Sequence, residues 1–248
     1  MNKALILIAK GILGAYNFLI PREKYTENDD VELAEIRQFA RKRTDISDHL
    51  ETLYREALAV RPKVIVELGV RTGASSFALS RAAEKTDSWL ISLDMEPTLF
   101  HSDYKNWRFV QADDIEFAEK FSEFAKETGF KRAIDFLFID TSHTYEHTRS
   151  EIQAWTSFLS PEGTMVFHDT NMKLIFKRKD GSLGGGWNNE RGVIRAVQEF
   201  LEADWDETKA YSGLHKGFSV EHFPNCSGLT ILRRAPRSGR ASVSASGE

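Results

Sequence analysis

The stretch Val64-Ile-Val-Glu-Leu-Gly-Val-Arg-Thr-Gly-Ala-Ser-Ser-Phe77 decides the fold. Its first five residues are apolar and largely β-branched apart from Glu67, which predicts a buried strand of a parallel sheet. Gly69 and Gly73 then mark a turn, and apolar residues recur at helical spacing over 74–84. A strand, a glycine turn and a helix in this order present backbone N–H groups and the positive helix end to a ligand.

The composition of the turn narrows the choice of ligand. A dinucleotide site is typified by GxGxxG, whereas this turn reads Glu67-x-Gly69-x-x-x-Gly73. A carboxylate beside the turn repels a pyrophosphate but attracts the amino group of an amino-acid ligand. The pattern resembles motif I of the class I S-adenosylmethionine-dependent methyltransferases, which implies that Glu67, Gly69, Gly73 and Ser75 bind the cofactor. An ordinary strand–helix turn is the alternative.

Two further predicted strands also end in acidic residues. Residues 89–94 end at Asp94, a position that suits a carboxylate accepting hydrogen bonds from a ribose diol. Residues 107–111 are followed by Asp113 and Asp114, where the resemblance places contacts with adenine. The three strand ends together predict S-adenosylmethionine as the cofactor.

Strands and helices alternate along most of the chain. We predict strands over 64–68, 89–94, 107–111, 134–139 and 163–168, and helices over 74–84, 115–127, 145–158 and 192–203. This order indicates a doubly wound α/β fold. The resemblance to the methyltransferases implies a Rossmann-like seven-stranded sheet, mostly parallel, with helices on both faces. An antiparallel closing pair is expected at 205–211 and 227–232, and a mobile loop at 173–189. The expected parts are an N-terminal helical or cap segment (1–59), the methyltransferase domain (60–233) and a disordered tail (234–248).

Composition and charge bound the class of protein. The 248 residues are 41% hydrophobic and 28% charged, as in soluble globular proteins. A net charge of −4 provides no basic field, so no nucleic-acid partner is expected. Cys226 is the single cysteine, which excludes an internal disulfide and fits a reducing compartment. We therefore expect a cytoplasmic protein.

The N-terminal segment from Ala4 to Ile20 is strongly apolar, but Lys10 and two glycines interrupt it. The segment is too short and too broken for a convincing transmembrane helix. We expect an apolar helix, and three partners for it stay open: the domain itself, a second subunit of a homo-oligomer, or a membrane surface.

The candidate metal ligands and the candidate general base follow two later predicted strands. Asp140 and Asp169 each follow a strand, and the carboxyl ends of parallel strands meet at one edge of the sheet. Two converging carboxylates suit a hard divalent cation such as Mg²⁺, which would bind a substrate hydroxyl and lower its pKa. His143 comes three residues after Asp140 and suits a general base. The alternatives are a structural histidine and acids that only cap helices.

These two segments, Phe138-Ile-Asp-Thr-Ser-His-Thr-Tyr-Glu146 and Pro161-Glu-Gly-Thr-Met-Val-Phe-His-Asp-Thr170, carry a closer resemblance. They are similar to the metal-dependent O-methyltransferases of the macrolide-sugar and polysaccharide type, grouped with cephalosporin-hydroxylase-like proteins. The resemblance implies methyl transfer to a saccharide or small-molecule hydroxyl, with Asp140 and Asp169 on the metal and His143 as base. It leaves the third ligand open among Thr170, Asn171 and His168; a histidine ligand would admit a softer metal than Mg²⁺.

Three other functions remain as rivals. An NAD-dependent oxidoreductase would require the third glycine that the turn lacks. An accessory protein of the cephalosporin-hydroxylase-like kind would bind the cofactor without transferring its methyl group. A non-catalytic interaction module would have lost the chemistry altogether, and only an activity measurement separates it from an enzyme.

Overall fold

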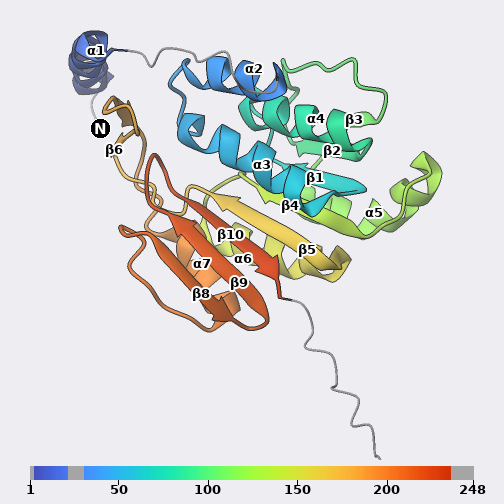
Figure 1. Cartoon of the computed structure of the whole chain (residues 1–248). Helices are drawn as coiled ribbons and strands as arrows, with labels where there is room; N and C mark the ends of the chain where they lie inside the picture. The colour runs from blue at the N-terminus through green and yellow to red at the C-terminus, as the bar shows by residue number, and fades with distance from the viewer. Residues whose placement is uncertain (1–2, 22–30, 236–248) are drawn as a thin grey trace, which may run out of the picture.

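The computed structural model of the chain describes residues 3–21 and 31–235 (Figure 1). Its strands are β1 (Val64–Leu68), β2 (Trp89–Asp94), β3 (Trp107–Gln111), β4 (Ile134–Ile139), β5 (Leu159–His168), β6 (Ile175–Lys177), β7 (Leu183–Gly185), β8 (Tyr211–His215), β9 (Phe218–Phe223) and β10 (Leu229–Arg234). Its α-helices are α1 (Lys3–Leu19), α2 (Val31–Ala40), α3 (Leu50–Val60), α4 (Ala74–Thr86), α5 (Asp114–Thr128), α6 (Tyr145–Trp155) and α7 (Gly192–Leu201).

The main sheet has eight strands in the order β3-β2-β1-β4-β5-β10-β9-β8. The first five are parallel neighbours, and β10 runs antiparallel to β5. The predicted doubly wound, mostly parallel α/β class is confirmed. The described sheet holds one strand more than the seven expected, because β8 adds an antiparallel edge beside β9.

The C-terminal strands differ from the expectation. The strand predicted over 205–211 is wrong, since β8 begins only at Tyr211 and turns back as β9. The hairpin between them turns at Lys216 and Gly217, whose φ angles are +49° and +78°. The side chains of β9 are alternately buried and less buried, which is the period-2 pattern of a half-buried strand. That alternation and the glycine turn were the available sequence signals.

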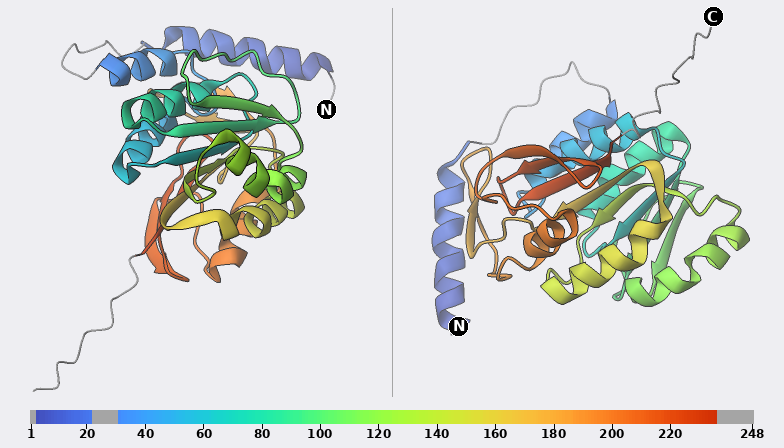
Figure 2. Two further views of the ribbon diagram at one scale, coloured as in Figure 1. Left: turned by 90° about the vertical axis from the view of Figure 1, so that its right-hand side faces the viewer. Right: turned by 90° about the horizontal axis from the view of Figure 1, so that it is seen from below.

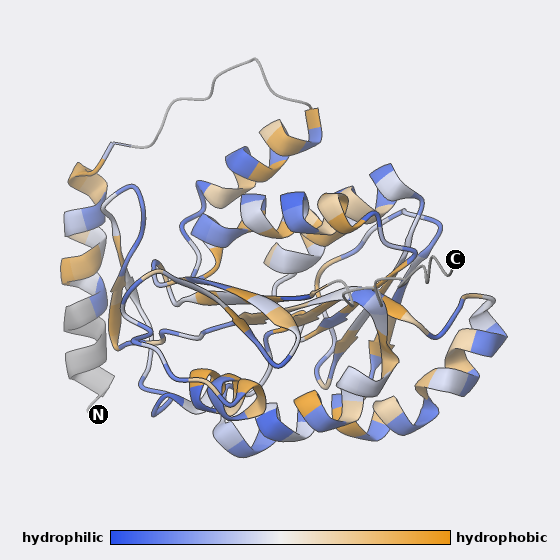
Figure 3. Ribbon diagram, turned by 60° about the horizontal axis from the view of Figure 1, so that its bottom comes forward, coloured by the Kyte–Doolittle hydropathy of each residue, from blue (hydrophilic) through white to orange (hydrophobic). Residues whose placement is uncertain are grey.

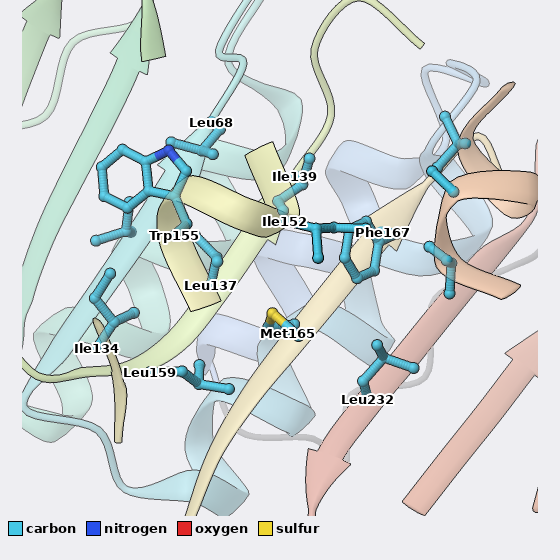
Figure 4. Packing of buried hydrophobic residues seen from close by; sticks show 14 of the residues in the cluster. Leu68, Ile134, Leu137, Ile139, Ile152, Trp155, Leu159, Met165, Phe167 and Leu232 are labelled. Atoms are coloured by element: carbon cyan, nitrogen blue, oxygen red, sulfur yellow. The ribbon is translucent and has the colours of Figure 1, made fainter. Parts of the chain in front are cut away.

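Helices cover both faces of the sheet, α2, α3 and α4 on one face and α5, α6 and α7 on the other (Figure 1). On the second face, Trp155 and Ile152 of α6 lie against Leu137 of β4 and Met165 of β5 (Figure 4). The covering helices carry hydrophilic and hydrophobic residues together, as amphipathic helices do (Figure 3). Burial of these apolar surfaces provides the main stabilisation of the three layers.

The segment 173–189, expected to be a mobile loop, instead contains the hairpin of β6 and β7. Helix α1 lies along this hairpin at the edge of the molecule (Figure 2). Asn17 fixes the contact, because its side-chain amide donates to the carbonyl of Leu183 and accepts from the N–H of Leu183, both at 2.7 Å. Of the three partners left open for this helix, the structure shows a contact with the domain itself, through the β6–β7 hairpin.

Two further findings concern the ends of the chain. Among the described residues, no helix combines the length and apolar character needed to cross a membrane. The predicted tail begins one residue too early, because Arg234 closes β10. The rest of that prediction, from residue 236 onward, lies outside the described residues.

The strand register determines where the site forms. Leu68 of β1 pairs with Leu93 of β2 and with Ile139 of β4, and Ile139 pairs with Phe167 of β5. The residues that follow these positions therefore leave the sheet side by side at one edge. They are Gly69, Asp94, Asp140 and His168.

Candidate active site

A pocket of about 430 Å³ lies at this carboxyl edge of the sheet, within the size range of small-molecule sites. It joins the ends of β1, β2, β3, β4 and β5. Its wall is formed by Asp45, Gly69, Val70, Arg71, Leu93, Asp94, Met95, Ala112, Asp113, Asp114, Asp140, Thr141, Ser142, His143, His147 and Asp169. Most of the predicted site residues are thus brought together in one space.

The structure brings Asp140, His143 and Asp169 into contact. Nε2 of His143 lies 3.1 Å from Oδ1 of Asp140 and 3.0 Å from Oδ2 of Asp169. The loop after β4 supplies Asp140 and His143, and the end of β5 supplies Asp169. His143 is in place because Thr144 caps α6, accepting a hydrogen bond from the N–H of His147. One candidate base and two carboxylates therefore share one corner of the pocket.

Burial of this corner perturbs its acids and bases. Burial lowers the pKa of His168, but the carboxylates of Asp169 and Asp140 outweigh it and raise that pKa to about 10. Burial likewise lowers the pKa of His143, but the hydrogen bond that His143 donates to Asp140 and the charges of Asp140 and Asp169 outweigh burial and raise that pKa. For Asp140, burial is outweighed by His168 and His143, which hold its pKa well below its usual range. The carboxylates of Asp140 and Asp169 thus favour the protonated form of both imidazoles while no cation lies between them.

The same residues fit a divalent cation. One ligand atom each from Asp140, His143 and Asp169 lies within 4.8 Å of the others. Oδ1 of Asp169 is buried without a hydrogen-bond donor, which leaves a lone pair of that carboxylate for another partner. Carboxylate oxygens are ligands of Mg²⁺ and Mn²⁺, and an imidazole nitrogen adds affinity for later transition metals.

Of the three candidates for a further ligand, His168 lies nearest to the acids. Its Nδ1 is 3.2 Å from Oδ1 of Asp140 and 3.3 Å from Oδ1 of Asp169. The hydroxyl of Thr170 faces away from them, 3.5 Å from Nδ1 of His222. The side-chain amide of Asn171 donates to the carbonyl of Pro224 at 2.6 Å. The structure therefore does not bring the Thr170 hydroxyl, the ligand predicted from sequence, to the carboxylates.

Asp94 lies in the pocket wall and holds the glycine turn. Its Oδ2 accepts hydrogen bonds from the backbone N–H groups of Val70 and Arg71, both at 2.8 Å. Its Oδ1 accepts from the N–H of Glu96 at 2.9 Å. The N–H of Gly69 donates to the carbonyl of Leu93, so these backbone donors of the turn are already bonded within the protein. The carboxylate of Asp94, with lone pairs to spare, remains available to a diol.

Glu67 is fully buried and does not line the pocket. Its Oε2 accepts hydrogen bonds from the hydroxyls of Ser76 and Ser92, at 2.8 and 2.6 Å. Burial raises the pKa of Glu67 to about 7, against the opposing hydrogen bonds, the largest from Ser75. Strand alternation explains this placement, because Glu67 shares its side of β1 with Ile65 and faces α4. The structure therefore places Glu67 and Ser75 beneath the turn.

Of the remaining predicted cofactor residues, Asp113 and Asp114 line the pocket and Gly73 does not. Gly73 precedes α4 as its N-cap with a φ of +78°, and a Cβ there would lie 2.3 Å from the side chain of Phe100. Asp113 caps α5 by accepting from the N–H groups of Ile115 and Glu116. Asp114 is buried, and its Oδ1 lies 3.1 Å from Nε2 of His147. His147 is part of the pocket wall, with 23% of its side chain exposed.

Sequence reasoning missed Asp45, which enters the wall from the segment before α3 and pairs with Arg71 at 3.0 Å. No local pattern marks this aspartate, because only the packing of α3 on the sheet brings it to the pocket. Trp187, which follows the glycine run 184–186, also lies beside this corner of the pocket. Its ring centroid lies 5.6 Å from that of His143, and its side chain is 47% exposed.

Comparison with known proteins agrees with this architecture. Residues 66–170 match a family model described as "Methyltransferase domain". A curated relative, protein y4gI of Sinorhizobium fredii (strain NBRC 101917 / NGR234), is 27% identical over 128 residues. That match spans 46% of this chain but only 14% of the length of y4gI.

Three solved structures share the fold at low sequence identity. Cofactor-bound Rv0187 from MTB is 14% identical with a TM-score of 0.55, covering 85% of this chain and 93% of its own. The SAH-bound Podospora anserina methyltransferase PaMTH1 is 12% identical with a TM-score of 0.51, over 94% and 97%. MycE from the mycinamycin biosynthetic pathway, in complex with Mg and SAH, is 18% identical with a TM-score of 0.52. There the match covers 85% of this chain and 57% of MycE.

Proposed function

Since the chain carries a class I, S-adenosylmethionine-dependent methyltransferase domain, with residues 66–170 matching the family model, we propose that it methylates a hydroxyl group with the help of a divalent cation. The single observation that carries the proposal is the position of His143. Its Nε2 lies 3.1 and 3.0 Å from two carboxylates that share a pocket with Asp94 and the glycine turn. This position supports a general base beside a candidate cation site, next to the residues that we propose for the nucleoside.

The pocket divides between two ligands in this proposal. Asp94 accepts hydrogen bonds from the ribose, Asp113 and Asp114 border the adenine, and the turn from Gly69 to Gly73 lies beside the methionine part. Glu67 supports the turn from below through Ser76 and Ser92. The corner of Asp140, His143 and Asp169 receives the acceptor hydroxyl. This division places the acceptor next to the end of the cofactor that carries the methyl group.

The chemistry follows from these positions. When bound, the cation lowers the pKa of the acceptor hydroxyl, and S-adenosylmethionine supplies the methyl group at its sulfonium. Asp140 and Asp169 would hold the cation, whose positive charge favours the neutral form of His143. Nε2 of His143 would then take the hydroxyl proton, while the acceptor oxygen bonds to the methyl carbon and the carbon–sulfur bond breaks. Catalysis rests mainly on the alignment of the hydroxyl with the methyl group.

The acceptor we propose is a sugar or a glycosylated natural product. MycE, which has the same fold, has been solved with Mg, SAH and mycinamycin VI. Trp187, about half exposed beside His143, offers an aromatic face of the kind that packs on the apolar side of a sugar ring. Leu174 and Ile175, at the start of the β6–β7 hairpin that precedes Trp187, are also exposed, and the N–H of Gly186 donates to the carbonyl of Leu174.

Calorimetric titration with S-adenosylhomocysteine, in Mg²⁺ and again in EDTA, tests the first part of the proposal. Micromolar binding, about −8 kcal/mol, is expected in both buffers, because the cation serves the acceptor. Methyl transfer to a panel of sugars and macrolide glycosides, required to stop in EDTA, tests the second part. Absence of binding by folded protein would overturn the proposal and favour an interaction module.

A further inference from the structure

A second cluster of potential metal ligands lies where α5 and α6 border the pocket, apart from the corner of Asp140 and Asp169. Helix α6 provides His147 and Glu151, four residues apart and so on one face of the helix. Asp114, the first residue of α5, faces them from the neighbouring helix. One ligand atom from each of the three lies within 4.8 Å of the other two.

The contacts within this cluster are incomplete. Nε2 of His147 lies 3.1 Å from Oδ1 of Asp114 and 3.8 Å from Oε1 of Glu151. The hydroxyl of Thr141 donates to Oε1 of Glu151 at 2.6 Å and fixes that carboxylate. The other oxygen of each carboxylate, Oδ2 of Asp114 and Oε2 of Glu151, is buried without a hydrogen-bond donor. Their side chains are 8% and 0% exposed.

Two buried carboxylates at this separation require a positive partner. A buried carboxylate is unstable unless it is paired or coordinated, and the repulsion between two adds to that instability. His147 can contribute one positive charge at most, and its single contacting nitrogen does not reach the two unpaired oxygens. The cluster therefore needs either a cation or a proton shared between Asp114 and Glu151.

We propose that Asp114, His147 and Glu151 bind a divalent transition-metal ion, at a site separate from Asp140 and Asp169. The donors are one imidazole nitrogen and carboxylate oxygens, a set that suits Mn²⁺, Fe²⁺ or Zn²⁺ better than Ca²⁺. The ion can enter from the pocket, because Asp114 and His147 are in its wall. Such an ion ties the start of α5 to α6 next to the wall that holds Asp113.

The test is the number of Mn²⁺ ions that the full chain binds after its metals have been removed with EDTA. Titration followed by electron paramagnetic resonance measures the free ion directly, without cofactor or acceptor. Wild type is expected to bind two ions. Asp169→Asn is expected to bind one, and asparagine suits the left-handed backbone of that position (φ +56°). His147→Ala is also expected to bind one, with at least a tenfold loss of affinity at the altered site.

Two variants make the result unambiguous. Glu151→Gln keeps the shape of the buried side chain, so a folded variant that binds one ion supports the proposal independently of His147. Glu146→Gln removes an exposed carboxylate from the same helix and is expected to bind two ions. Thermal unfolding adds a second readout: Mn²⁺ should raise the Tm of Asp169→Asn but not that of Asp169→Asn combined with His147→Ala.

The proposal is overturned if wild type binds one ion, which Asp169→Asn abolishes and which His147→Ala and Glu151→Gln leave unchanged. A proton shared between Asp114 and Glu151 then neutralises the cluster. Neither outcome depends on methyl transfer, so failure of the second metal site is distinct from failure of the proposed function.

Discussion

Nε2 of His143 lies 3.0 Å from Oδ2 of Asp169, although the two residues belong to different loops and both have left-handed backbones. Their φ angles are +61° and +56°. Non-glycine residues adopt this conformation at a cost of about 1–3 kcal/mol, and such positions concentrate at active sites. The fold therefore uses part of its stability to hold the imidazole against the carboxylate.

The first prediction concerns His143 as the general base. His143→Ala is expected to lower kcat for methyl transfer by about 10²–10⁴-fold, because the acceptor proton loses its recipient. The Kd for S-adenosylhomocysteine and the amount of metal bound at Asp140 and Asp169 should stay unchanged. Steady-state kinetics and calorimetry on the same preparation measure all three.

The exposed His101 supplies the control, and His101→Ala should behave as wild type in each assay. Full activity in His143→Ala would remove the proposed base. Loss of metal together with activity would instead make His143 a ligand, which its position between the two carboxylates also allows.

The second prediction concerns Trp187 and the acceptor. Trp187→Ala is expected to raise the KM for a sugar acceptor about tenfold, as expected if about 1.4 kcal/mol of aromatic contact is lost. Trp187→Phe should retain most of the affinity, because it keeps an aromatic face. The Kd for S-adenosylhomocysteine should not change in either variant. An equal loss of acceptor and cofactor binding would show that Trp187 only supports the fold of its loop.

The third prediction separates two glycines that share a left-handed backbone. Gly69 has a φ of +89°, and a Cβ there would lie 2.0 Å from the carbonyl oxygen of Asp140. Gly129 has a φ of +91°, with nothing within 4 Å of the same atom. Gly129→Ala should cost about 1 kcal/mol of unfolding free energy, the backbone contribution alone.

Gly69→Ala should cost at least about 3 kcal/mol, because it adds displacement of Asp140 to the same backbone cost. Urea unfolding of the two variants measures the difference, and methyl transfer by Gly69→Ala should fall with the shift of Asp140. Equal destabilisation by both substitutions would show that the loop after β4 moves aside freely.

Much of the fold could be predicted because local patterns and packing agree. The five parallel strands read as apolar runs ending in glycine or acid, and the family match confirms the methyltransferase assignment made from Val64 to Phe77. The hairpins β6–β7 and β8–β9 were missed, since short strands with glycines or polar residues do not differ from loops in sequence. Their pairing depends on contacts with α1 and β10, which lie far away in the chain.

The site was predictable where a strand end supplies the residue. Asp94, Asp140, His143 and Asp169 meet at the sheet edge because parallel strands finish there together. Glu67 shows where sequence reasoning fails. The sequence places it at the end of the strand, but the side of β1 from which it projects makes it face α4 instead of the pocket. Asp45 could not be predicted either, because tertiary packing alone brings it to the wall of the pocket.

The burial of Glu67 leads to a prediction about pH and stability. Burial raises its pKa from 4.5 to about 7. Between these values the unfolded chain loses the proton while the folded protein keeps it, so the folded state binds more protons and the free energy of unfolding falls as pH rises. By pH 8 the raised pKa of Glu67 lowers the free energy of unfolding by about 3 kcal/mol.

The variant Glu67→Gln tests this prediction, because its side chain cannot ionise but keeps an oxygen for Ser76 and Ser92. It should gain stability relative to wild type from pH 5 to pH 8. Urea unfolding across this range measures the gain, with exposed Glu119→Gln as the control that should follow wild type. A difference between Glu67→Gln and wild type that stays constant with pH would show that Glu67 is already ionised in the folded protein at pH 5.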